Sequence, residues 1–430
     1  MTTPASAAVA VPVAEQSREP ASVLESSIRR FEEWLQAYGE TSFDFQTLYA
    51  NQYGRFAKSL YYRNRPLGTL AVAPLVFCEA FVPSARSLVW KQQRFPIADA
   101  HYAMAFARLY RHGGERRHLE RAVHFLDVLL ESSAPGESGL GWGYPFDWET
   151  IDGTIPRGTP LITTLPYVYE AVAAVYELDR RERWRTVMQS IAAHALRDYQ
   201  KKGRSGRKGG MGGRAATCTY TPMASDRGMV VNANAYRSFL LTKAACDLEN
   251  DELLTSVEPN LQFVLAAQRP EGSWPYATDQ RRPFVDHFHT CFVLKALVKI
   301  VQLTPRADCQ QAIDRGLRYY ADQLFDAEGL PRPFAKRPRL IVYRRELYDY
   351  AEAINLLTLV RGRSRDLDAL LQTTVADVLA RWQRTDGSFR TRQLFAGWDE
   401  VPMHRWAQAQ LFRSLCGLLG GAEEAKPLHA

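Results

Sequence analysis

The sequence has few cysteines for its 430 residues, and no two of them stand in a Cys-x-x-Cys spacing. The six cysteines are scattered along the chain, which argues against a structural zinc site or a disulfide framework. Cys246, Cys291 and Cys416 lie in apolar segments and are expected to pack as free thiols, as in a reducing compartment. We therefore expect a cytoplasmic protein with no metal site and no cofactor.

Long apolar runs are also missing. No stretch of 18 consecutive apolar residues occurs, so no transmembrane helix is expected. Residues 1–22 lack the basic start of a signal peptide and are rich in Ala, Val, Pro and Thr, which predicts a disordered tail. Residues 23–420 are expected to form a single domain, followed by a C-terminal tail at 421–430.

Signals for β-strands are weak, the best being Leu340–Tyr343. The sequence contains instead a repeated turn of glycine and an aromatic residue, at 141–145, 272–276, 329–334 and 387–389. The later turns recur about 58 residues apart, which is the length of two helices with their loops.

Two kinds of helical pattern alternate around these turns. The amphipathic segments, charged on one face, are 27–38, 115–133, 181–200, 251–268, 308–325 and 366–383. The segments of the second kind are apolar on most faces and begin near residues 99, 163, 232, 286, 348 and 404. Six apolar helices inside six amphipathic helices would bury both sets, which predicts an all-α (α/α)6 toroid; the alternative is an open solenoid of helix pairs.

All inner helices of such a toroid begin at the same end, so the residues at their starts should surround one funnel. Candidate catalytic residues are Asp286, His289, Tyr348, Asp349 and Glu352, because His and Tyr can transfer protons and paired carboxyl groups can act as acid and base. Candidate substrate-binding residues are Trp142, Tyr144, Asp147, Asn232, Asn234, Tyr236, Trp274, His287, Arg344, Arg345, His404, Arg405 and Trp406. Aromatic faces with a few polar groups are typical of a carbohydrate site.

Several candidates also have a purely structural interpretation. Helix capping could be the sole role of Asp286 and Asn232. Trp142 and Trp274 could fill the space between paired helices. The pair His287 and His289 could bind a metal, but a single neighbouring carboxylate supports it.

The turns Gln268–Trp274 and Gln383–Phe389 share the pattern Gln-x-x-x-Gly-x-aromatic, and they resemble the QW motifs of terpenoid cyclases and prenyltransferases. The sequence lacks the Asp-x-Asp-Asp acid motif of the cyclases and the Asp-Asp-x-x-Asp metal motif. The resemblance therefore implies a helical toroid more than it implies cyclase chemistry.

A second resemblance covers about residues 139–415 and is carried by Gly141–Asp147, Gly272–Tyr276, Asp286–Thr290 and Tyr343–Asp349. These segments are similar to those of bacterial exopolysaccharide-biosynthesis proteins of the VpsJ type. The resemblance implies a toroid like that of glucuronyl C5-epimerases, polysaccharide lyases and six-hairpin glycosidases, and a setting in polysaccharide biosynthesis.

Three hypotheses follow from these patterns. The first is a carbohydrate epimerase, lyase or glycosidase acting on an anionic oligosaccharide or polysaccharide or its precursor, since the net charge of +7 favours anionic partners. The second is a terpenoid-cyclase or prenyltransferase-like enzyme. The third is a non-catalytic polysaccharide-binding assembly protein.

No nucleic-acid partner is expected. Peripheral association with a membrane assembly machinery is expected instead. The basic, glycine-rich segment 201–214 is interpreted as a surface loop or as an arm for an anionic chain.

Overall fold

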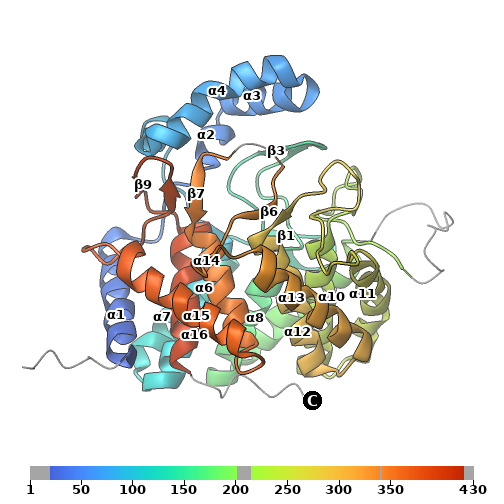
Figure 1. The fold of residues 1–430 in the computed structure, drawn as a ribbon. Coiled ribbons are helices and arrows are strands. Elements are labelled where there is room, and N and C mark those ends of the chain that lie inside the picture. The colour runs from blue at the N-terminus through green and yellow to red at the C-terminus, as the bar shows by residue number, and fades with distance from the viewer. Residues whose placement is uncertain (1–19, 201–214, 339–340, 421–430) are drawn as a thin grey trace, which may run out of the picture.

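The computed structural model describes residues 20–200, 215–338 and 341–420 (Figure 1). The predicted tails at 1–22 and 421–430 and the basic segment 201–214 lie outside the described residues, except that residues 20–22 begin the first helix. Helices dominate the described part of the chain, and its strands are two to four residues long.

The inner ring consists of six largely buried helices that follow one another in space in their chain order. They are α6 (Pro96–Gly113), α8 (Leu165–Asp179), α10 (Val231–Leu248), α12 (His287–Leu303), α14 (Leu347–Leu359) and α16 (Ala409–Leu419), the last preceded by the π-helical turn η4 (His404–Gln408). Each helix contacts the next, and α16 contacts α6. The ring is therefore closed, and the predicted toroid is confirmed over the open solenoid.

The outer ring consists of six amphipathic helices that bury their apolar faces against the inner ring. They are α1 (Pro20–Tyr38), α7 (Arg116–Glu131), α9 (Glu182–Arg197), α11 (Val257–Ala266, preceded by η2, Asp251–Ser256), α13 (Ala307–Gln323) and α15 (Arg365–Asp377, continued by η3, Val378–Trp382). The first helix, α1, packs on α16 and η3. Its Glu32 lies 3.0 Å from His118 of α7, so α1 also closes the outer ring.

The repeated turn locks one helix pair to the next. Gln268 Nε2 donates to the carbonyl oxygens of Gly272 (3.1 Å) and of Ala312 on α13 (2.9 Å). Gly272 has a φ of +101°, and a Cβ atom there would lie 2.4 Å from the Arg315 carbonyl oxygen. Only glycine combines this backbone conformation with so close an approach to α13.

The turn at Gln383 repeats this arrangement against α1. Gln383 Nε2 donates to the carbonyl oxygens of Gly387 (3.1 Å) and of Ser27 (2.9 Å). A Cβ atom on Gly387 would lie 2.2 Å from the Arg30 carbonyl oxygen. The last of the repeated turns thus packs against the first helix and is hydrogen-bonded to it.

In the described part of the chain, nine short strands pair in antiparallel fashion at the end of the toroid where the inner helices begin, which we call the rim (Figure 1). They are β1 (Ala134–Pro135), β2 (Leu140–Gly141), β3 (Trp148–Thr150), β4 (Gly153–Ile155), β5 (Val285–Asp286), β6 (Phe334–Lys336), β7 (Tyr343–Glu346), β8 (Arg392–Leu394) and β9 (Trp398–Asp399). The strand expected at Leu340–Tyr343 is displaced to β7, because its pairing partner β8 faces residues 343–346. Leu340 lies outside the described residues.

A helical hairpin above the rim was not predicted. It comprises α2 (Thr47–Ala50), α3 (Gln52–Arg63), α4 (Arg65–Phe81), the 3-10 turn η1 (Pro83–Ala85) and α5 (Arg86–Val89), inserted between the first outer and the first inner helix (Figure 1). Its helices do not follow the repeat of about 58 residues, so the repeat pattern could not reveal them.

We expect Gly272→Ala to destabilise the protein far more than Gly362→Ala. Gly362 also has a positive φ (+79°), but nothing lies within 4 Å of its Cβ position. The control should therefore lower the free energy of unfolding only by the backbone cost of about 1 kcal/mol. Gly272→Ala adds a clash with α13 and should lower the free energy of unfolding by about 3 kcal/mol or more. Urea unfolding of both variants measures the difference; equal losses would show that the turn does not lock α13.

Candidate functional site

Asp286 and His289 form a hydrogen-bonded dyad at the start of α12. The pairing of β5 with β6 holds Asp286 in an extended conformation (φ −117°, ψ 171°). Its Oδ1 accepts from the backbone N–H of His289 at 2.9 Å, and its Oδ2 lies 2.6 Å from His289 Nδ1. Asp286 is 2% exposed, whereas the His289 side chain is 21% exposed. The carboxylate therefore keeps the proton on Nδ1 and leaves Nε2 to accept one, as a general base requires.

Aromatic rings surround His289. The centroids of Phe288 and Tyr276 lie 4.4 Å and 4.5 Å from the imidazole, and that of Phe292 lies 5.5 Å from it. Tyr276 stacks on Phe284 at 4.9 Å. Apolar ring faces beside a polar group are the composition that binds the C–H surface of a sugar.

The structure brings Tyr348 to the same end of the ring as His289. Phe288 contacts both residues, with centroid distances of 4.4 Å to His289 and 4.8 Å to Tyr348. Tyr348 stacks on Trp406 at 5.7 Å, and Gln410 Nε2 lies 3.4 Å from its hydroxyl. Burial raises the pKa of Tyr348 well above its usual value, so the phenol keeps its proton. Tyr348 is therefore a neutral phenol at neutral pH and does not act as a base there.

Glu352 lies one helical turn further into the ring than Tyr348. It is fully buried and forms an ion pair with Lys295 of α12, which is 4% exposed. Its carboxylate is therefore neutralised inside the ring and is not available at the rim.

Further charged groups fill the centre of the ring. Lys299 of α12 pairs with Glu170 of α8, and because α10 lies between these helices in the ring, this ion pair crosses the lumen. Arg413 of α16 donates to Nδ1 of His101 on α6 at 3.0 Å. Buried ion pairs and hydrogen bonds therefore occupy the lumen of the ring.

Glu170 and Lys299 keep their charges at neutral pH. Burial alone would raise the pKa of Glu170, but the cations Lys299, Arg413 and Lys243 together outweigh burial and bring that pKa to about 2. Burial lowers the pKa of Lys299 to about 8, although the Glu170 carboxylate acts to raise it. Burial and then Arg413 lower the pKa of His101 well below its usual value, so His101 is neutral. With Lys295 and Arg413, the lumen network has three cations beside the carboxylates of Glu170 and Glu352.

Apart from Glu352, none of these lumen charges was predicted as part of the site. A signal existed, because Lys295 and Lys299 stand four residues apart in an otherwise apolar segment and so share one helix face. Glu170 and Arg413 interrupt apolar segments in the same way. Charges inside buried helices are kept where they are paired.

Asp349 is a buried acid without a hydrogen-bond partner among the described residues. It is 1% exposed, and neither carboxyl oxygen has a partner. Burial, and then the nearby carboxylates Glu346 and Asp286, raise its pKa well above the usual value. The group is therefore protonated at neutral pH and cannot serve as a carboxylate base.

Replacing Asp349 by Asn should make the protein relatively more stable as the pH rises. An unfolded aspartate releases its proton near pH 3.9, whereas native Asp349 keeps it. Between these two pKa values the unfolded state binds fewer protons, so the free energy of unfolding of the wild type falls with rising pH. Asp349→Asn removes this loss, which amounts to at most about 1.4 kcal/mol per pH unit. Urea unfolding between about pH 4 and 8 measures it, and a difference that does not change with pH would contradict the buried, protonated state.

Two tryptophans predicted to bind substrate are wedges between paired helices. Trp142 is completely buried, and its Nε1 donates to the Leu129 carbonyl at 2.7 Å. Trp274 is 3% exposed, and its Nε1 donates to the Val264 carbonyl at 2.9 Å. Both indoles are held within the helix wall, so their predicted contact with substrate is corrected to a structural role.

His287 and His404 are likewise corrected to structural residues. His287 Nε2 lies 2.8 Å from the Tyr320 hydroxyl, and burial lowers the pKa of His287 to about 3. His404 Nδ1 lies 2.5 Å from the Tyr102 hydroxyl, and burial lowers the pKa of His404 to about 4. Both rings are fully buried and neutral. His287 joins α12 to the outer helix α13, whereas His404 joins the start of the last inner helix to α6 and, through the Gly39 carbonyl at 3.1 Å, to the end of α1.

Asn234 and Arg405 are also enclosed. Asn234 accepts from the Cys218 N–H and donates to the Val230 carbonyl, both at 2.8 Å, and it is completely buried. Arg405 is completely buried in a bidentate ion pair with Asp44 at 2.7 Å. Their predicted role in binding substrate is therefore corrected to a structural one.

Arg405 nevertheless contacts two aromatic side chains at the rim. Its guanidinium lies 3.5 Å from the Trp406 ring centroid and 4.5 Å from that of Tyr144. Both rings are partly exposed and remain candidates for contact with substrate.

The other candidate binding residues have partners of their own. Asp147 pairs with Arg55, and Arg345 pairs with Asp326. Arg344 is exposed, with its guanidinium 5.9 Å from the Phe395 ring.

Asn232 and Tyr236 lie on α10 and are both buried. Tyr236 shares a hydrogen bond of 2.5 Å with the Tyr167 hydroxyl. Asn232 Oδ1 has no partner among the described residues. For these two residues, as for Asp147, Arg344 and Arg345, a contact with substrate stays a prediction.

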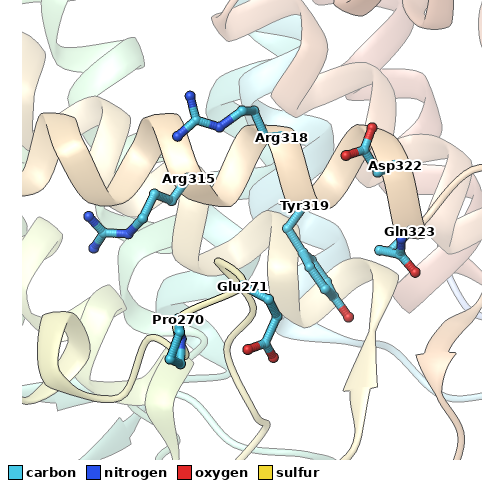
Figure 2. A pocket seen from close by; sticks show the side chains of 7 residues that line it. All are labelled: Pro270, Glu271, Arg315, Arg318, Tyr319, Asp322 and Gln323. Atoms are coloured by element: carbon cyan, nitrogen blue, oxygen red, sulfur yellow. The ribbon is translucent and has the colours of Figure 1, made fainter.

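A separate hollow of about 570 Å³ lies on the outer wall, between the turn at Pro270 and Glu271 and the helix α13 (Figure 2). Its α13 side carries Arg315, Arg318 and Tyr319. None of the candidate catalytic residues lines it, so we place the site at the rim.

No protein-family model and no curated protein matches the sequence. Several solved structures share its fold. A cellobiose 2-epimerase from Bacillus thermoamylovorans is 10% identical, with 76% of this chain and 88% of that chain covered and a TM-score of 0.58. A glycosyl hydrolase of family 88 from Bacteroides vulgatus is 10% identical, covering 94% and 99%, with a TM-score of 0.56. An unsaturated glucuronyl hydrolase from Bacillus sp. GL1, described as responsible for glycosaminoglycan degradation, is 10% identical, covering 92% and 96%, with a TM-score of 0.55. At these identities the likeness concerns the fold alone: the chain shares the α/α toroid of these proteins.

Proposed function

We propose that the protein is a carbohydrate-active enzyme that moves a proton on a sugar carbon of an anionic oligosaccharide or polysaccharide, as an epimerase or a lyase. The observation that carries this proposal is the Asp286–His289 dyad, an oriented imidazole partly exposed among aromatic rings at the rim. The shared toroid gives further support, because the similar structures include an epimerase and a polysaccharide lyase.

A uronate residue offers the proton that such a dyad could remove, because its C5–H is acidified by the adjacent carboxylate. His289 Nε2 takes this proton, and the electron pair of the C–H bond moves into the carboxylate. Asp286 stabilises the imidazolium that results. Tyr348 then gives its proton to C5 on the opposite face, which completes an epimerisation. In a lyase reaction the electron pair instead returns to form a C4=C5 double bond, the bond from C4 to the glycosidic oxygen breaks, and Tyr348 gives its proton to that oxygen. Transfer of a proton from His289 back to Tyr348, directly or through water, restores the epimerase; in the lyase, His289 releases its proton to solvent and Tyr348 takes one up.

Glycoside hydrolysis is less well supported by the carboxyl groups near the dyad. A glycosidase needs two of them flanking the scissile bond. Asp286 is bonded to His289, Glu352 is neutralised by Lys295, and Asp349 is buried and protonated. The ionic lumen also argues against a terpenoid cyclase, whose substrate needs an apolar cavity.

Deuterium incorporation from D2O tests this proposal and separates an enzyme from a binding protein. The wild type should introduce deuterium into a uronate-containing oligosaccharide, or cleave it to an unsaturated product, and should leave a neutral oligosaccharide unchanged. His289→Ala should slow this reaction by about 10²–10⁴-fold. Its free energy of unfolding should change by less than about 1 kcal/mol, because the side chain is partly exposed. Tyr348→Phe should also lose activity, since it keeps the ring and removes the donor.

His124→Ala is the matched control for the histidine change. His124 is 43% exposed on the outer helix α7, where it contacts Glu40, so its removal should leave the reaction rate unchanged. Equal rates for His289→Ala and the wild type would contradict the role of the dyad. Binding of uronate oligosaccharides in calorimetry without any deuterium incorporation would favour the non-catalytic alternative.

A further inference from the structure

One face of α4 exposes large apolar side chains. Leu67, Leu70, Phe77 and Phe81 are 55%, 73%, 58% and 63% exposed. Their spacings of three, seven and four residues place them along a single side of the helix, which we call the apolar face of α4. Scattered exposed apolar residues are normal on a protein surface, but a continuous row on one helix indicates a contact surface.

The opposite side of α4 shows that this face is not a loosely packed part of the main core. The hairpin has a small core of its own, made of Leu48, Ala57 and Leu75. Its two long helices touch through glycine: a Cβ atom on Gly68 would lie 2.1 Å from the Tyr61 Cα atom. The helices of the hairpin are therefore closely packed against each other. The hairpin nevertheless exposes to solvent apolar side chains that are larger than those in its own core.

An apolar groove of about 430 Å³ continues this surface towards the rim. On the α4 side it is lined by Val76, Phe77 and Phe81, and on the rim side by Val342 and Phe395. Phe395, in the turn between β8 and β9, is itself 57% exposed. The exposed apolar surface thus spans the hairpin and the adjoining edge of the toroid.

The charges of the hairpin are almost all positive. From residue 51 to residue 90 the sequence has five basic residues, Arg55, Lys58, Arg63, Arg65 and Arg86, and a single acidic residue, Glu79. Glu79 is held by Tyr49 (2.9 Å) and Arg392 (3.5 Å). The exposed residues Arg63 and Arg65 flank the turn between α3 and α4. An apolar helix face bordered by exposed cations matches the acyl layer and the anionic headgroups of a lipid surface.

We propose that the α3–α4 hairpin docks on an anionic membrane surface, with the apolar face of α4 in the interface. Among the described residues, no single helix is long and apolar enough to cross a membrane; Arg65–Phe81 and Pro83–Val89 meet that test together, but a bend of 116° separates them. A bent pair of helices with one apolar side can lie in the membrane interface, with that side in the acyl layer.

The hairpin is fixed to the rim. Arg86 forms a buried ion pair with Asp399 of β9, and Arg55 pairs with Asp147 at 2.7 Å. Docking therefore brings the rim close to the lipid surface, and, if the proposed function holds, the enzyme acts on saccharide chains held there, such as lipid-linked ones. The docking itself does not depend on that function, because it is measured without any saccharide.

Sedimentation of the full chain with lipid vesicles tests the proposal. The wild type should bind vesicles of phosphatidylcholine with one third phosphatidylglycerol, and it should bind less at about 1 M salt, where surface charges are screened. The double variant Leu70→Glu/Phe77→Glu should bind at least about tenfold more weakly. Arg63→Glu/Arg65→Glu should lose the preference for anionic over pure phosphatidylcholine vesicles.

Leu303→Glu is the matched control. Leu303 is 37% exposed at the last residue of α12, the end of the ring away from the rim, and its replacement should leave vesicle binding unchanged. Thermal unfolding confirms that each variant is folded; should the double variant unfold, Leu70→Glu alone, at a 73% exposed position, replaces it. Absence of binding by the wild type, or equal binding by the hairpin variants, would overturn the proposal. So would a dimer that forms without lipid, disappears in the double variant and fails to bind vesicles, since a second copy would then cover this face.

Discussion

The contact between α16 and α6 closes the inner ring, and the rest of the structure depends on this closure. An inner helix is apolar on most sides and is buried only when it has a neighbour on each flank. The outer ring closes in the same place, because the turn with Gly387 packs against the backbone of Arg30 in α1. Since all six inner helices run in the same direction, closure also gathers their first residues at one rim.

At that rim, one carboxylate connects the fold to the proposed chemistry. Asp286 caps α12 by accepting from the His289 N–H, and it orients the His289 ring through Nδ1. The residue that begins the helix therefore also sets which imidazole nitrogen can take a proton. Burial keeps Tyr348 protonated on the other side of Phe288, and ion pairs in the lumen join α12 to α14 and to α8.

The sequence was sufficient for the features that depend on local spacing. Alternating apolar and amphipathic segments predicted the toroid, and the spacing of three positions from Asp286 to His289 predicted that their side chains project together. The sequence was insufficient where the role of a residue depends on a partner that is distant in the chain. Glu352 resembles a free catalytic carboxylate until Lys295 is placed beside it. Trp142 and His287 have the composition of site residues, and only the fold supplies the buried groups that bond their polar atoms.

The claim that a saccharide binds over His289 is tested most directly by modifying histidines with diethyl pyrocarbonate and locating the products by peptide mass spectrometry. His289, with 21% of its side chain exposed, should react, and a uronate oligosaccharide should protect it. His124, on the outer wall, should react equally with and without the saccharide. A His289 that does not react, or that reacts at the same rate in the presence of saturating saccharide, would contradict a substrate site at the rim.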